Sequence, residues 1–164
     1  MPHGSDLWSD WLEEHGAALL LFARQWVSNQ ADAEDVVQEA FVRFWRSRGH
    51  VAEPAGYLFA AVKHCALDRQ RARARQSRRE ESIAVPECEP SFDIAEQDER
   101  GAVIAAALKE LPESQREVLV LKIWGGLSFP QIAEALQISP NTAASRYRYA
   151  LAKLREQLLE ESIR

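Results

Sequence analysis

One short stretch of the chain is rich enough in arginine to bind phosphate groups. Residues 69–79 read RQRARARQSRR, with six arginines and no acidic residue. Guanidinium groups bind phosphate oxygens through paired hydrogen bonds, and a local cluster of them is a typical electrostatic footprint of nucleic-acid binding. A fraying helix end with solvated arginines would have the same composition. The absence of acidic residues among the arginines favours phosphate contact.

Candidate catalytic residues are few. His64 and Asp68 are four positions apart and would share one face of a helix, as an acid–base pair requires. No nucleophile, metal-ligand spacing or glycine-rich phosphate loop accompanies them, since Cys65 and Cys88 form no C-x-x-C motif and the four histidines are scattered. We therefore expect no enzymatic activity, no metal site and no cofactor.

A second group of polar residues lies on the last periodic segment, which ends near Glu160. Its apolar residues recur at helical spacing and predict a buried stripe of Ala143, Tyr147, Leu151, Leu154 and Leu158. If this segment is the second helix of a helix-turn-helix, its first turns enter the major groove of DNA. The residues then expected near bases are Asn141, Thr142, Ser145 and Arg146, and those expected near phosphates are Arg148, Tyr149 and Lys153. An ordinary solvated helix face would have the same spacing.

The elements that would carry these residues are all helical. Apolar residues three and four apart predict helices over residues 7–28, from an N-cap at Asp32 to Trp45, and from Ala55 into the arginine stretch. Later helices are expected over 94–111 and 113–124. No segment alternates as a strand does, so the fold class is all-α.

Local signals near the C-terminus predict the helix-turn-helix itself. Gly125-Gly126 ends one helix, and Ser128 with Gln131 forms a capping box for a short helix that ends near Leu136. Ser139 caps the last helix, with a proline in its first turn. The intervening turn, 137–139, is about three residues long, as in this motif.

Charge divides the chain into two nearly neutral parts and an acidic link. Residues 1–79 and 101–164 each carry a net charge of +1, whereas residues 80–100 hold eight acidic residues and one arginine. We predict two small helical domains, 1–79 and 101–164, joined by an acidic linker at 80–100. No apolar run is long enough to cross a membrane and no secretory signal is evident, so we expect a cytoplasmic protein without membrane insertion.

Both halves resemble a bacterial extracytoplasmic-function (ECF) sigma factor of the sigma-70 superfamily, a small subunit of RNA polymerase. Residues 32–45 (DAEDVVQEAFVRFW) are similar to the core-binding helix of that family, and residues 57–71 (YLFAAVKHCALDRQR) to its helix for the promoter -10 element. The domain that reads the -35 element is matched by LPESQREVLVL at 111–121, GGLSFPQIAEAL at 125–136 and ISPNTAASRYRYALAKLR at 138–155.

The resemblance implies a transcription initiation factor that binds core RNA polymerase, directs it to promoters and assists promoter melting. Its partners would be the β′ clamp helices and β flap of the polymerase, promoter DNA and an anti-sigma factor. The residues implied in polymerase binding are Asp32, Glu34, Asp35, Gln38 and Glu39. Those implied in -10 contacts are Lys63, His64, Asp68, Arg69, Arg71 and Arg73, and the -35 contacts would be the polar residues of the last helix given above.

Several positions depart from the pattern of the family. Ala144 stands where a lysine is usual and Tyr149 where an arginine is usual, so we expect weaker phosphate anchoring by the C-terminal domain. Gln137 replaces the usual glycine of the turn, where a left-handed conformation would cost about 1 kcal/mol. His64 replaces an asparagine.

Two alternative functions remain: a helix-turn-helix regulator that does not bind polymerase, and an adaptor that has lost promoter binding. The acidic linker would either imitate RNA near the polymerase active centre or act as a solubilising tether.

Overall fold

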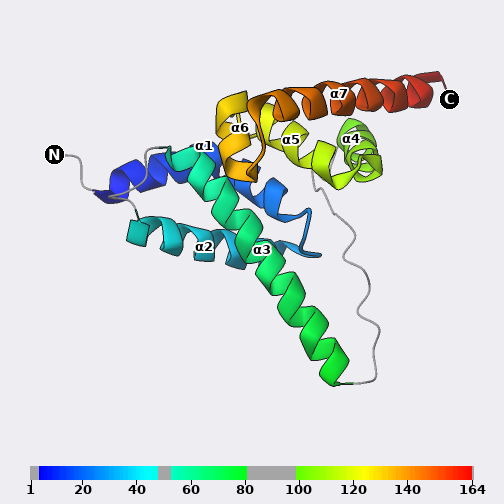
Figure 1. Ribbon diagram of the computed structural model, residues 1–164. Coiled ribbons are helices and arrows are strands. Elements are labelled where there is room, and N and C mark those ends of the chain that lie inside the picture. Colours follow the sequence, from blue (N-terminus) through cyan, green and yellow to red (C-terminus); the bar gives the residue numbers. More distant parts are fainter. Residues whose placement is uncertain (1–3, 48–52, 81–98, 164) are drawn as a thin grey trace.

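The computed structural model describes the backbone of residues 4–47, 53–80 and 99–163, and their side chains except those of residues 4–8 and 11. Within these ranges the chain forms seven helices and no strand (Figure 1), which confirms the expected all-α fold. The predicted helix start at residue 94 and most of the predicted acidic linker lie outside the described residues. The helices are α1 (Gly4–Ala23), α2 (Gln30–Ser47), α3 (Pro54–Arg79), α4 (Glu99–Glu110), α5 (Glu113–Ile123), α6 (Phe129–Leu136) and α7 (Pro140–Ile163).

The N-terminal group of helices, α1 to α3, packs around large apolar side chains. Leu19 and Phe22 of α1, Val36 of α2, and Phe59 and Val62 of α3 are all fully buried. The rings of Phe22 and Phe59 meet edge to face with their centroids 5.5 Å apart, a favourable aromatic geometry. The three-and-four spacing in the sequence therefore marks the side of each helix that faces the core.

Two local expectations for this group are wrong. The first helix ends at Ala23 rather than near residue 28, and residues 24–26 form a turn that keeps Trp26 buried. The second helix is capped by Asn29 rather than by Asp32, because Asn29 Oδ1 accepts a hydrogen bond from the backbone N–H of Asp32 at 2.8 Å. The Asp32 carboxylate lies instead in the first turn, where the helix dipole favours negative charge.

The C-terminal group, α4 to α7, contains the predicted helix-turn-helix in α6 and α7. Ser128 and Gln131 form the predicted capping box at the start of α6. Gln137 adopts the left-handed conformation, with φ 58° and ψ 46°, which confirms the strained turn expected where glycine is usual. The backbone N–H of Thr142 donates to Ser139 Oγ at 3.1 Å, so the predicted cap of α7 is also confirmed.

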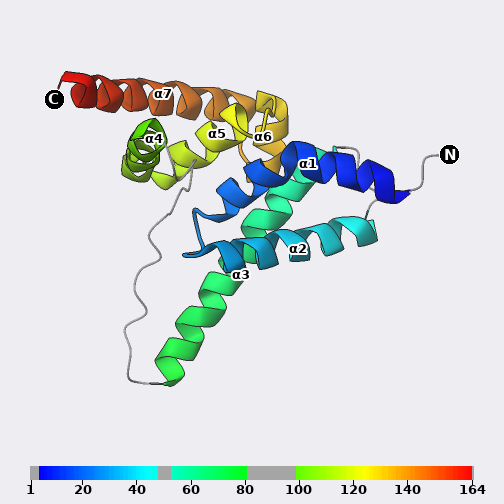
Figure 2. The same cartoon turned by 180° about the vertical axis from the view of Figure 1, so that it is seen from behind.

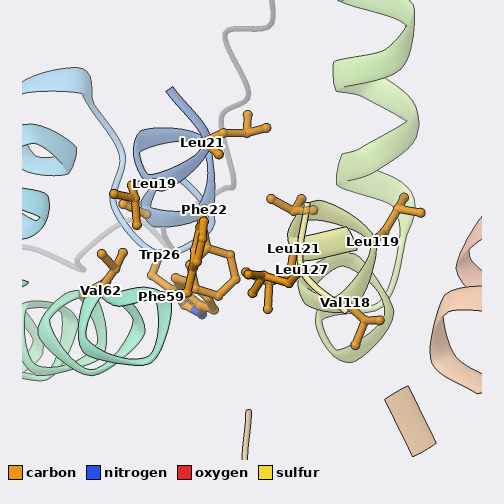
Figure 3. Packing of buried hydrophobic residues seen from close by; sticks show 14 of the residues in the cluster. Leu19, Leu21, Phe22, Trp26, Phe59, Val62, Val118, Leu119, Leu121 and Leu127 are labelled. Carbon is orange, nitrogen blue, oxygen red and sulfur yellow. The ribbon is translucent and has the colours of Figure 1, made fainter. Parts of the chain in front are cut away.

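The two groups of helices pack against each other. α3 contacts α6, and α1 contacts α5. Figure 3 shows Phe22, Trp26 and Phe59 on the side of the N-terminal group that faces Leu121 and Leu127, and these side chains belong to one continuous cluster of buried residues. The view from behind in Figure 2 shows the same arrangement, with α6 against the upper part of α3. The domain boundaries at 79 and 101 remain a prediction.

Polar contacts reinforce this packing between the groups. Trp26 Nε1 donates to Glu113 Oε1 at 3.0 Å, and Arg116 Nε donates to Gln25 Oε1 at 3.2 Å. Both Gln25 and Arg116 are buried. Buried polar groups are costly without partners, so these bonds favour one specific arrangement of the two groups.

Candidate nucleic-acid and polymerase interfaces

The first turns of α7 present a polar surface that is open to solvent. Asn141, Arg148, Tyr149 and Lys153 are exposed, and the Tyr149 side chain stands out with 68% of its surface accessible. Ala143, Ala150 and Leu154 are buried on the opposite side, where α7 packs on α5 and α6. The helix is thereby held with the predicted -35 residues directed outwards.

The other predicted -35 residues lie at the border of this surface. Thr142, Ser145 and Arg146 are partly buried. The Ser139 hydroxyl donates a hydrogen bond to Thr142 Oγ1 at 2.8 Å. Arg148 Nη2 donates a long hydrogen bond to Ser145 Oγ at 3.5 Å. All seven predicted -35 residues therefore lie on α7, between Asn141 and Lys153.

The predicted -10 residues on α3 are not equally available. His64 and Asp68 are exposed. Lys63 is turned toward the C-terminal group, where its Nζ lies 2.6 Å from Glu117 Oε1 and 5.8 Å from the centroid of the Trp26 ring. This predicted DNA contact is therefore engaged in the packing between the groups.

Glu117 is the partner of Lys63 on α5, and sequence reasoning did not single it out. Its side chain is only 5% exposed, against 23% for that of Lys63. At this distance the Lys63 ammonium and the Glu117 carboxylate form a close ion pair. Burial raises the pKa of Glu117 above its ordinary value, while the positive charges of Lys63 and Arg146 act in the opposite direction. The available sequence signal was an acidic residue directly before the apolar run VLVL at 118–121.

Two more predicted -10 residues bind predicted polymerase contacts of the same chain. Arg69 Nη1 lies 3.4 Å from Asp32 Oδ1 and 3.4 Å from Asp35 Oδ2. Arg73 also forms an ion pair with Asp32. The aspartates at the start of α2 and this side of α3 therefore neutralise each other. Arg71, in contrast, has 72% of its side chain exposed and only a 3.7 Å contact with Asp68 of its own helix.

The remaining predicted polymerase contacts form an exposed polar row on α2. Glu34 accepts a hydrogen bond from Gln30 at 3.3 Å, and Glu39 pairs with Arg43 at 3.0 Å. Gln38 is exposed as well. All three side chains are exposed, so α2 presents carboxylate and amide groups to solvent.

An apolar groove lies beside this row, and sequence reasoning missed it. It has a volume of about 770 Å³ and is lined by Ser9 and Leu12 of α1 and by Val37, Gln38, Phe41, Val42, Trp45 and Arg46 of α2. We refer to it as the α1–α2 groove. The apolar stripe of residues 36–45 predicts that Trp45 lies in the core. This prediction is wrong, because Trp45 is 42% exposed and the buried residues of α2 are Ala33, Val36, Val37 and Ala40. Val42, an apolar residue off the buried stripe, was the available signal.

Three further features of the described residues concern metal binding, thiol reactivity and membrane insertion. No cluster of three or more His, Cys, Asp or Glu residues that could hold a metal occurs in those ranges. Burial raises the pKa of the Cys65 thiol to about 11, so this cysteine is protonated and unreactive at neutral pH. None of the described helices is long and apolar enough to cross a bilayer.

Comparison with protein families finds two matches, in the order of the chain. The family described as Sigma-70 region 2 matches residues 11–76, and the family described as Sigma-70, region 4 matches residues 102–154. The first match contains most of α1 to α3, and the second contains α5, α6 and most of α4 and α7.

Curated relatives match over nearly the whole chain. The ECF RNA polymerase sigma factor SigL of Mycobacterium tuberculosis is 34% identical over 160 residues, which cover 90% of this chain and 86% of the relative. The ECF RNA polymerase sigma factor SigE of Mycolicibacterium smegmatis is 31% identical over 94% of this chain, and the match spans 63% of that longer relative.

Solved structures share the fold across both groups of helices. CnrH in complex with the cytosolic domain of CnrY is 26% identical, with a TM-score of 0.63 over 95% of this chain and 90% of that one. The sigma factor RpoE in complex with the anti-sigma factor NepR from Bartonella quintana is 23% identical, with a TM-score of 0.66 over 92% of this chain and 97% of that one. Because two region matches cover most of the sequence and a relative above 30% identity spans both, the chain belongs to the ECF sigma factors of the sigma-70 family.

Proposed function

We propose that this protein is a dissociable transcription initiation factor that binds core RNA polymerase and directs it to specific promoters. The observation that carries the proposal is the presence of two kinds of surface in one chain. α7 exposes the polar first turns of a helix-turn-helix, which suit the major groove of DNA. α2 exposes an apolar groove beside a row of acidic and amide groups, which suits a protein partner.

The polymerase contact is proposed on α2. An apolar floor with a polar rim is the usual anatomy of a protein interface. Glu34, Gln38 and Glu39 would border the contact with the β′ clamp helices, and the α1–α2 groove would receive an apolar side chain of the partner. An anti-sigma factor that covers the same surface would keep the protein from the polymerase, and two structural neighbours are described in complexes with such a partner or with a cytosolic domain of another protein.

The DNA contacts are proposed on α3 and α7. His64, Asp68 and Arg71 are accessible for the -10 element as the protein stands, and Asn141 and Arg146 offer amide and guanidinium groups that can pair with adenine and guanine at the -35 element. The protein would act by binding alone, in the cytoplasm, with promoter melting favoured by contacts to the separated strand. The β flap would hold the C-terminal group near the -35 element.

The packing of the two groups implies a movement during initiation. The -10 and -35 elements are separated by about 25 base pairs, or about 85 Å of duplex at about 3.4 Å per base pair. In the compact arrangement Gln131 Nε2 donates to Glu53 Oε2 at 3.0 Å, so α6 and the start of α3 are in contact. In the same arrangement Lys63 of the predicted -10 set and Arg146 of the predicted -35 set both act on the Glu117 carboxylate, so the two sets lie much closer together than the two promoter elements. We infer that the groups separate on the promoter and that Lys63 leaves Glu117 as they do.

The test is transcription by purified core polymerase on a fragment library of the source genome, with and without the protein. New transcripts with defined start sites are expected only when the protein is present. Val42→Glu places a charge in the α1–α2 groove and should abolish binding to core polymerase. Leu159→Glu, on the exposed end of α7, is the matched control and should retain it.

The same experiment separates the alternative function. A helix-turn-helix regulator would bind specific duplexes without polymerase and would not bind core enzyme. If the wild-type protein fails to bind core polymerase while it selects DNA fragments alone, the initiation-factor proposal is wrong and the regulator takes its place. Core binding without any transcript would instead indicate an adaptor.

A further inference from the structure

The arginines of α3 lie on two opposite faces of the helix. At about 100° per residue, Arg69 and Arg73 share one face, whereas Arg71, Arg75 and Arg78 fall within about 60° of one another on the other. We call Arg69 and Arg73 the inner pair and Arg71, Arg75 and Arg78 the outer stripe. From the residue types alone, these five arginines are equivalent. Arg79, the sixth arginine and the last residue of α3, lies about 100° from Arg78 and is not counted in either set.

The inner pair is occupied within the protein. Arg69 contacts both Asp32 and Asp35, and Arg73 contacts Asp32, so two carboxylates of α2 neutralise two arginines of α3. These contacts tie the middle of α3 to the start of α2. The inner pair therefore positions α3, and the acidic start of α2 is shielded by it.

The outer stripe is directed away from α2 and is accessible. Its three arginines are exposed, and Arg71 makes only the weak contact with Asp68 on its own helix. No ion pair joins Arg75 or Arg78 to another residue in the ranges that the structure describes. Both views show this part of α3 extending beyond the other helices (Figures 1 and 2).

The spacing of the outer stripe fits the backbone of a duplex. Residues 71 to 78 rise about 10 Å along the helix axis, which corresponds to about three base-pair steps of a duplex at about 3.4 Å of axial rise per step. Ala72 and Ala74 stand between the arginines and leave room for a close approach. Residues 68–80 contain no aromatic side chain, and stacking on aromatic rings is what usually holds single-stranded bases. The ligand chemistry is therefore the phosphate backbone of duplex DNA.

We propose that Arg71, Arg75 and Arg78 form a phosphate-binding stripe for duplex DNA next to the melted segment, while Arg69 and Arg73 hold α3 on α2. This inference rests on the proposed function, because it requires the protein to lie on promoter DNA. It adds Arg75 and Arg78 to the DNA contacts and removes Arg69 and Arg73 from them. An exposed helix of this composition lacks the apolar face that a membrane surface would require.

The test measures promoter affinity of the reconstituted holoenzyme over a series of potassium chloride concentrations. Each lost phosphate contact lowers the slope of log affinity against log salt by about 0.9. Arg75→Gln/Arg78→Gln should therefore reduce the slope by about 2 and leave thermal unfolding unchanged. Arg69→Gln/Arg73→Gln removes the same charge from the opposite face and should leave the slope unchanged while it lowers the melting temperature.

A second control removes two exposed cations elsewhere, Lys109→Gln/Arg155→Gln, and corrects for net charge. Equal slope changes in the outer and inner double variants would overturn the proposal, as would an unchanged slope in Arg75→Gln/Arg78→Gln. The two failures are distinguishable, because an unchanged slope in a holoenzyme that still initiates transcription rejects only the stripe. Absence of wild-type core binding or transcription rejects the proposed function and the stripe with it.

Discussion

The two helices proposed to bind DNA differ in how many of their predicted contact residues are available without breaking an intramolecular ion pair. On α7, four of the predicted contacts are exposed and the other three lie at the border of the same surface, which is fixed by the Ser139 cap and the buried stripe beneath it. On α3, Lys63 is paired with Glu117, and Arg69 and Arg73 are paired with aspartates of α2. The -35 surface is preformed, whereas half of the predicted -10 residues are engaged by carboxylates of the same chain.

The difference shows that a list of basic residues does not define a binding surface. A positive side chain contributes to DNA affinity only after its intramolecular partner has been released, and that release costs free energy. The cost is larger for the Lys63–Glu117 pair, whose carboxylate is 5% exposed, than for the arginine pairs with Asp32, whose carboxylate is 15% exposed, because solvent screens the more accessible pairs more. The variants below test this ranking.

The largest effect is expected at Glu117. Breaking a fully buried ion pair costs about 3–5 kcal/mol, and the partial exposure of Lys63 reduces the expected cost to about 2 kcal/mol. Glu117→Ala should therefore favour separation of the two groups about 30-fold and speed promoter binding by the holoenzyme. Small-angle scattering measures the separation as an increased radius of gyration. Glu110→Ala, an exposed acid on α4, is the control.

An unchanged radius of gyration in Glu117→Ala, in a variant that remains helical, would mean that the apolar contacts alone hold the groups together. In that case the Lys63–Glu117 pair would not limit the availability of the DNA-binding surface of α3, and α3 and α7 would not differ in this respect.

Loss of a base-reading side chain on α7 should come next. Asn141→Ala removes an exposed amide without disturbing the core and should cost about 1–2 kcal/mol of discrimination at one base pair. The measurement is the ratio of affinities for the native -35 element and for single-base variants. If substitutions of Thr142 and Ser145 lower the affinity for all DNA sequences equally, these residues contact phosphates rather than bases.

The Glu117 pKa predicts a pH dependence of the compact state. Its pKa is raised in the compact form, so this form binds the proton more tightly than the separated form. As pH falls through the raised pKa toward the ordinary value of 4.5, the compact form should gain stability, at most about 1.4 kcal/mol per pH unit. Raising the pH reverses the gain. Glu117→Gln should flatten the radius of gyration measured over this range.

The smallest effect is expected at the partly exposed pairs between α2 and α3. Asp32→Asn should lower the free energy of unfolding by about 0.5–1 kcal/mol, which corresponds to roughly 2 °C in melting temperature. Asp35→Asn, with a more exposed carboxylate and one long contact, should have less effect. A loss at Asp32 as large as that at Glu117 would show that burial does not set the ranking.

Features that depend on near neighbours were determined by the sequence alone. The helices around Leu58, Val62 and Leu121 and the capping box at Ser128 were predicted correctly, because each depends on residues within four positions. The family resemblance was also visible in contiguous motifs and is supported by both region matches.

The tertiary structure alone decided which charged residues meet. Lys63 and Glu117 are 54 positions apart, and Asp32 and Arg73 are 41 apart, so no local spacing indicates either pair. The exposure of Trp45 and the α1–α2 groove depend in the same way on how α1 crosses α2. Helical periodicity specifies which side of a helix is apolar, but the partner of a polar side chain is specified only when distant helices pack together.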